Sequence, residues 1–265
     1  MNYYAEVEKD ETFFYWHEFA PSDIHYVRLS ESEPFLIATG HKIDDVFYSF
    51  ANARVSFLNS FAEDFGDISE DDNLSRLYAK THFLTNALIE YAICRDISWQ
   101  VVWASIQPSS FDYLIHQKYK EMEKECTSES VHCQLNCAIS QGGSESQLAA
   151  RIKVHLSSFE NDPTVQELRH LYNYIKHCGM LHFEGLGAIR DSMFASVNGQ
   201  SIPILSRKRC RVDELEELLY SYHFKFESFF NELVEIIMPD YYNKQEATFD
   251  EYFRILLKMK KSLDN

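Results

Sequence analysis

Hydrophobic positions recur at helical spacing along most of the chain. Residues 74–107 contain no Gly or Pro, are followed by Pro108, and carry apolar side chains on every side, which predicts one long buried helix. Residues 212–238 carry one apolar face, end before Pro239, and predict a second long helix. The same periodicity predicts shorter helices over residues 42–63, 112–124, 145–159 and 249–261. The pattern therefore predicts a mainly α fold.

Other segments depart from helical spacing. Residues 24–29 and 35–38 predict short strands on either side of a turn at 30–34. Residues 126–146 are rich in Ser, Gly and Gln, so we expect a loop or a frayed segment there. Asn198-Gly199 is the preferred two-residue hairpin turn, which predicts a small β-hairpin from the residues flanking it, 194–197 and 201–205.

These patterns divide the chain into two parts. Residues 1–40 form an N-terminal extension with short strands, and residues 41–265 form an all-helical domain into which the β-hairpin is inserted. The acidic stretch 64–73 is expected to be a surface loop.

Residues 163–178 predict a helix with two contrasting faces. Asn161 and Asp162 precede Pro163 at its start, and Gly179 ends it. At 100° per residue, one arc is apolar and carries Leu168, Leu171, Tyr172 and Ile175. The opposite arc carries donors suited to a polyanion, namely Arg169, His170, Asn173, Lys176 and His177. A solvated helix face of no special function is the alternative interpretation. We expect Leu168, Leu171, Ile175, Trp99 and Trp103 to lie in the core.

Composition limits the class of protein. Of the 265 residues, 45% are hydrophobic and 15% aromatic, which is ample for a sizeable core. The formal net charge of −16 argues against binding nucleic acid through a broad basic face, so any RNA contact must be local. A second basic spot, residues 207–211, is more typical of a solvated loop before a helix than of a phosphate site.

Cysteine use and hydropathy indicate the compartment. The six cysteines are scattered through a chain too large to need disulfides, so we expect reduced thiols. His132, Cys133 and Cys137 are too weak a cluster to predict zinc, and we expect no metal. There is no apolar run of 18 residues and no secretory signal pattern, so we expect a cytoplasmic protein without membrane contact.

The run Asn173-Tyr174-Ile175-Lys176-His177 resembles the Arg-Asn-x-x-Lys-His segment of bacterial members of the HEPN superfamily. The chain departs from that segment at one position, because Tyr172 stands where the family has Arg. The nearest Arg, Arg169, lies one helical turn earlier. The resemblance covers about a dozen residues directly and the rest of the chain through its all-helical pattern.

The resemblance implies an HEPN-like helical bundle and a metal-independent endoribonuclease, of toxin or defence type, that needs no cofactor. It implies that His177 is the general acid or base and Arg169 the phosphate clamp, with Asn173 and Lys176 orienting or neutralising the RNA. Because such proteins build their cleft from two subunits, it also implies a homodimer.

Three neighbours complete the expected site. His170 and Tyr172 adjoin these residues on the same helix, and Asp96 on the long helix 74–107 could meet a cation of the Arg169 face. A surface carboxylate is the alternative for Asp96. The alternative for the whole site is a non-catalytic helical module that binds RNA, a nucleotide or a protein partner through the same face, and Tyr172 favours it.

Overall fold

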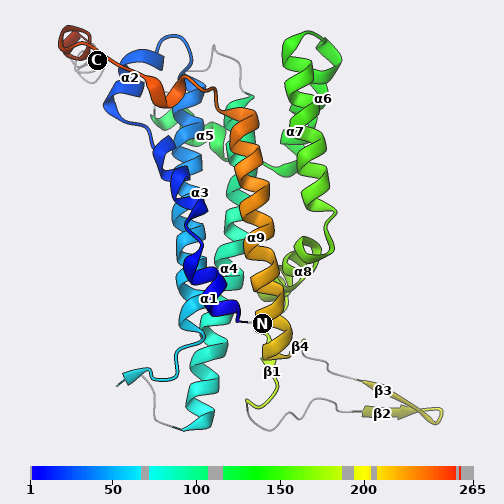
Figure 1. The fold of residues 1–265 in the computed structure, drawn as a ribbon. Coiled ribbons are helices and arrows are strands. Elements are labelled where there is room, and N and C mark those ends of the chain that lie inside the picture. The colour runs from blue at the N-terminus through cyan, green and yellow to red at the C-terminus, as the bar shows by residue number, and fades with distance from the viewer. Residues whose placement is uncertain are drawn as a thin grey trace. The chain divides into compact units, whose positions relative to one another are not determined.

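The computed structural model describes residues 2–66, 72–106, 116–186, 194–203, 208–254 and 257, and the protein is mainly helical (Figure 1). The described α-helices are α1 (Tyr3–Lys9), α2 (Asp23–Leu29), α3 (Pro34–Asn59), α4 (Asn73–Ser105), α5 (His116–Glu123), α6 (Ser128–Gln141), α7 (Ser144–Glu160), α8 (Pro163–His177) and α9 (Val212–Ile237). Two 3₁₀-helices, η1 (Thr12–Phe19) and η3 (Tyr242–Lys244), and four short strands, β1 (His182–Phe183), β2 (Phe194–Val197), β3 (Gln200–Pro203) and β4 (Arg209–Cys210), are also described. The mainly α prediction is confirmed.

The chain forms two compact units, each built from three separate segments. The first unit comprises Met1–Asp10, Phe50–Ile93 and Glu160–Lys225. The second comprises Glu11–Ser49, Cys94–Phe159 and Phe226–Asn265. The long helices α3, α4 and α9 each contribute residues to both units.

Each unit has its own buried core. In the first unit, fully buried side chains come from α3, α4, α8 and α9 and include Phe57, Leu84, Leu88, Leu168 and Leu219. In the second unit, the Trp16 ring packs edge-on against Phe230 with centroids 4.8 Å apart, and its Nε1 donates to Asn231 Oδ1 at 2.7 Å. The buried indole therefore has the hydrogen-bond partner that its N–H needs.

The long helices agree with the sequence pattern. α4 covers nearly all of residues 74–107, and α9 ends one residue before the predicted limit. Trp99, Trp103, Leu168 and Leu171 are buried as predicted, whereas Ile175 is only half-buried. Ile175 lies in the last turn of α8 and is less completely covered than the leucines earlier in α8.

The predicted N-terminal strands are wrong. Residues 24–29 lie in α2, and residues 35–38 lie in the first turns of α3, which begins at Pro34. A capping box starts α2, because Ser22 and His25 bond each other's backbone N–H groups. Proline at the first position of α3 has the φ angle that a helix needs and favours the start of that helix.

The predicted loop over residues 126–146 is also wrong, since most of it is α6. Thr127 caps this helix through a reciprocal capping box with Ser130. Val131 and Leu135, one turn apart, are fully buried. Burial of this face outweighs the weak helix propensity of the Ser-rich and Asn-containing sequence, and Gly142, with φ of 75°, ends the helix.

The β-hairpin prediction is confirmed in the described residues. β2 pairs antiparallel with β3, and Val197 is opposite Gln200 across a turn in which Asn198 and Gly199 have φ of 54° and 77°. Leu205 of the predicted second strand lies outside the described residues. β1 and β4 form a separate parallel pair that the sequence did not predict.

The remaining helices are found in part. α5 matches the end of the helix predicted over residues 112–124, whose first residues lie outside the described part. Residues 249–254 are helical, and most of residues 255–261 also lie outside it. Among the described residues, the structure contains no helix long and apolar enough to cross a membrane.

Candidate functional site on helix α8

The start of α8 is fixed by Asp162. Its carboxylate accepts a hydrogen bond from Thr164 N at 2.8 Å and pairs with Lys225 Nζ at 2.5 Å. Burial opposes ionisation of Asp162, but the hydrogen bonds from Lys225 and Thr164 outweigh it and lower the pKa of this carboxyl. A negative charge at a helix N-terminus is favourable, so Asp162 both caps α8 and links it to α9.

The apolar face and the end of α8 set its orientation. Val165, Leu168 and Leu171 are buried in the core of the first unit. The Tyr174 hydroxyl accepts a hydrogen bond from Lys208 N at 3.0 Å, which ties the last turn to the residue before β4. Gly179, with φ of 145°, then turns the chain away, and the opposite face of α8 is left outward.

That outward face carries the predicted site residues. Arg169, His170, Asn173, Lys176 and His177 are all exposed, and Tyr172 is half-buried. No described residue pairs with the side chains of His170, Asn173, Lys176 or His177. We call the five exposed residues, Arg169, His170, Asn173, Lys176 and His177, the polar face of α8.

Arg169 has a partner of its own. Its Nη1 lies 3.6 Å from Glu160 Oε2, at the end of α7, and its side chain is 53% exposed. Eight residues of helix separate Arg169 from His177, a rise of about 12 Å. A single copy of α8 therefore presents the guanidinium and the imidazole on one side without bringing them together.

Asp96 lies in the second unit, and its carboxylate pairs with the neighbouring Arg95, Nη1 to Oδ1 at 2.9 Å. Asp96 is exposed. The carboxylate that pairs with Arg169 in this structure comes from Glu160, within the first unit.

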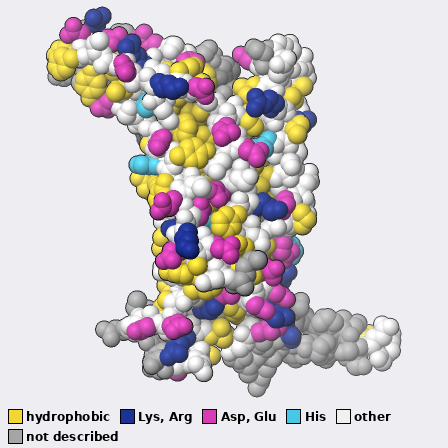
Figure 2. Space-filling view, viewed as in Figure 1, with side chains coloured by type: hydrophobic (Ala, Val, Ile, Leu, Met, Phe, Trp, Pro, Cys, Tyr) yellow, Lys and Arg dark blue, Asp and Glu magenta, His cyan; other side chains and the backbone are white. Residues whose placement is uncertain are grey.

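Two cations of the basic spot at residues 207–211 have acidic partners. Arg211 pairs with Asp213 at 2.5 Å and with Glu214 at 3.7 Å, and Lys208 pairs with Glu167 at 3.9 Å. Arg207 lies outside the described residues. Figure 2 shows acidic and basic side chains interspersed over the visible face, with neither sign forming a large patch there. This distribution agrees with a local site for any anionic ligand.

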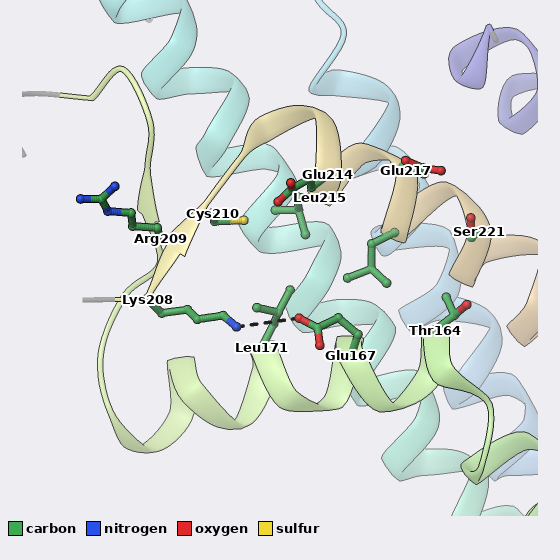
Figure 3. A pocket seen from close by; sticks show the side chains of 11 residues that line it. Thr164, Glu167, Leu171, Lys208, Arg209, Cys210, Glu214, Leu215, Glu217 and Ser221 are labelled. Atoms are coloured by element: carbon green, nitrogen blue, oxygen red, sulfur yellow. Dashed lines mark ion pairs between the residues drawn. The ribbon is translucent and has the colours of Figure 1, made fainter. Parts of the chain in front are cut away.

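A pocket that the sequence did not predict lies on another edge of α8 (Figure 3). α8 contributes Thr164, Glu167 and Leu171, and the other walls come from residues 208–210 and from α9. The polar face of α8 does not contribute to this pocket, nor to a second pocket formed by residues 60–63 and by Arg76, Leu77 and Lys80. Within the described part of the chain, the five residues of the polar face are exposed and line neither of these two pockets.

The sequence also did not predict a row of hydrogen-bonded, buried polar side chains in the first unit. His223, which is 0% exposed, bonds Asp10 Oδ2 through Nε2 at 2.8 Å and the Tyr91 hydroxyl through Nδ1 at 2.7 Å. Its ring stacks on Phe50 with centroids 4.7 Å apart. Burial lowers the pKa of His223 despite the nearby Asp10 carboxylate. Since solvent cannot reach this imidazole, its role is structural.

Metal-ligating side chains do not converge in the described part of the chain, where no group of three or more His, Cys, Asp or Glu residues could hold an ion. Cys133 and Cys137 are exposed on α6, and His132 packs edge-on against Trp99.

Comparisons of the chain with protein-family models, curated proteins and solved structures found no match.

Proposed function

We propose that the polar face of α8 binds RNA and cleaves it without a metal ion. The observation that carries this proposal is the sorting of side chains on α8: two imidazoles, a guanidinium, an ammonium and a carboxamide face outward, while the opposite face is anchored in the core. These groups are the donors that a phosphodiester needs, and they stand out in a chain of net charge −16.

His177 acts in this proposal as the general base or acid. An imidazole accepts the proton of a ribose 2′-hydroxyl, and the 2′-oxygen attacks the adjacent phosphorus. The bond from phosphorus to the 5′-oxygen breaks, and that oxygen takes up a proton as it leaves. The products are a 2′,3′-cyclic phosphate and a 5′-hydroxyl. Arg169 stabilises the charge that develops on the phosphorane oxygens, and Lys176 and Asn173 hold the neighbouring phosphate.

A two-fold dimer completes the cleft. The polar face of one α8 lines neither of the two pockets described above, and its Arg169 and His177 are separated along the helix. In a symmetric dimer, each copy presents the same face to the other, so that Arg169 of one α8 can approach His177 of its partner. His170 and Tyr172 would then lie at the edge of the composite cleft.

A non-catalytic binding module is the second candidate, and two observations favour it. Glu160 already neutralises Arg169, and a half-buried tyrosine occupies position 172. In this version the same face binds RNA, a nucleotide or an acidic protein segment, without a bond being broken.

Matched variants distinguish the two candidates. RNA binding is measured for Arg169→Ala and for Arg211→Ala, because both arginines are ion-paired and their side chains are 53% and 52% exposed. We expect weaker binding for Arg169→Ala alone. Cleavage is measured for His177→Ala against His82→Ala, another exposed histidine of the first unit. Loss of cleavage in His177→Ala alone supports the nuclease. Binding that depends on Arg169, without cleavage in the wild type, supports the module.

A further inference from the structure

The pocket beside α8 has a volume of about 400 Å³, a size that accepts a small organic ligand. Its walls come from three segments that are distant in sequence but belong to the same unit: α8, residues 208–210 and the first three turns of α9. Leu171, Leu215 and Leu218 provide an apolar lining. Figure 3 shows the side chains of Glu167 and Lys208 reaching toward each other across the opening.

Carboxylates dominate the charge of this lining. Glu167 comes from α8, and Glu214 and Glu217 come from successive turns of α9. The Arg209 side chain is directed away from the other labelled side chains in Figure 3, which leaves Lys208 as the cation directed into the pocket. Two of these carboxylates, Glu167 and Glu217, belong to different walls of the leucine-lined pocket, whereas Glu214 pairs with Arg211.

Lys208 indicates which ligand chemistry the pocket accepts. Its Nζ ends 3.9 Å from Glu167 Oε1, at the outer limit of an ion pair, and Leu171 lies beside this pair in Figure 3. The pocket already holds an alkylammonium group of its own chain, which pairs with a carboxylate in a lining that includes three leucines. Glu217, on the other wall, has no ionic partner among the described residues.

The thiol of Cys210 is a buried part of the same lining. Burial, followed by the carboxylates of Glu214 and Glu167, raises the pKa of Cys210 to about 11. This cysteine therefore stays protonated near neutral pH and acts as an apolar part of the lining, not as a nucleophile.

We propose that this pocket binds an aliphatic polyamine. One ammonium group would pair with Glu167 on the α8 wall, a second would pair with Glu217 on the α9 wall, and the methylenes between them would lie on the leucines. The site is separate from the polar face of α8 and does not depend on the proposed nuclease activity.

The test is calorimetric titration of the full chain with spermidine at about 0.15 M salt, where long-range attraction to the acidic chain is screened over roughly 8 Å. We expect saturable binding of one spermidine per chain. Glu167→Gln and Glu217→Gln should each weaken binding by about two- to fivefold, the effect typical of an exposed ion pair. Lys208→Ala should strengthen binding, because it removes the competing ammonium and frees Glu167.

The control is Glu145→Gln, which removes an exposed carboxylate of α7 in the second unit and should leave binding unchanged. Circular dichroism confirms that each variant is folded, and Glu217 is exposed enough for its variant to remain so. Equal weakening by Glu145→Gln and Glu217→Gln would overturn the proposal in favour of non-specific attraction to the acidic chain. Absence of saturable binding, or weaker binding by Lys208→Ala, would also overturn it, and capture of a lysine-rich peptide but not spermidine would assign the pocket to a protein partner.

Discussion

Two leucines on the same face of α8 should respond differently to truncation. Leu168 is 0% exposed and Leu171 is 4% exposed, so burial alone predicts nearly equal losses. Their surroundings differ, however, because Leu171 lines the pocket of about 400 Å³ and Leu168 does not. Removing a side chain beside an existing pocket enlarges that pocket, whereas removing one from a closed core creates a new cavity.

The magnitudes follow from these two terms. Leu→Ala removes three carbons from the apolar interior, which costs about 2.4 kcal/mol at about 0.8 kcal/mol for each buried CH₂. At Leu168 the cost of a new cavity adds to this, and the total loss should be about 3–5 kcal/mol. At Leu171 water can enter the widened pocket, so the loss should stay near the transfer cost, at about 2–3 kcal/mol.

Urea denaturation at neutral pH measures both losses. The matched control is Leu74→Ala, since Leu74 is 57% exposed at the start of α4 and should change the free energy of unfolding by no more than about 0.5 kcal/mol. A loss at Leu171 equal to or larger than that at Leu168 would refute the pocket as a solvent-accessible space. An unchanged midpoint for Leu168→Ala would show that this face of α8 is not in a core.

Other predictions concern different parts of the molecule. Gly40→Ala should lower the free energy of unfolding by about 1–3 kcal/mol, because the added Cβ would collide with the Tyr242 hydroxyl and with the Phe19 carbonyl oxygen; urea denaturation measures this, and a neutral result would contradict the close packing. Because burial lowers the pKa of His223, the unfolded chain binds a proton that the folded chain does not, so stability should be full above about pH 6.5 and should fall as the pH drops below it. Denaturation curves at pH 7.5 and 5.5 test this, and a chain more stable at pH 5.5 would contradict it. Light scattering at micromolar concentration should give twice the 31.1 kDa mass of one chain, and a monomer mass would count against the composite cleft.

Helices bounded by strong breakers could be predicted from the sequence. α8 begins at Pro163 behind its Asp162 cap and ends before Gly179, and all three signals are local. Because the helical wheel then determines which residues face outward, the exposure of Arg169 and His177 was also predictable. These features need no knowledge of the rest of the fold.

Segments stabilised by tertiary packing were not predictable in this way. The sequence around α6 is rich in Ser and contains Asn, and its helix is stabilised by the burial of Val131 and Leu135. The capping box of α2 uses His25 in place of the usual Glu or Gln, so the start signal was missed. Tertiary burial overrode the local propensity in α6, whereas the start signal of α2 was local but used an unusual residue.

Contacts between distant residues were beyond the sequence as well. Asp10 and His223 are 213 positions apart, and each alone resembles an ordinary polar residue. The pocket beside α8 requires β4, whose pairing with β1 has no strong strand pattern at only two residues per strand. A buried hydrogen bond between distant residues and a pocket formed from separate segments become visible only once the fold is known.

The chemical nature of the RNA ends tests the proposed nuclease activity most directly. The wild-type chain and His177→Ala are incubated with a mixed RNA pool in the presence of a chelator, and the products are examined for 2′,3′-cyclic phosphate and 5′-hydroxyl ends. A general acid or base contributes about 10² to 10⁴ in rate, so His177→Ala should leave little cleavage, while His82→Ala should retain it. The account predicts cyclic phosphate ends from the wild type and from His82→Ala alone. Intact RNA in every sample, or equal cleavage by His177→Ala, would contradict it.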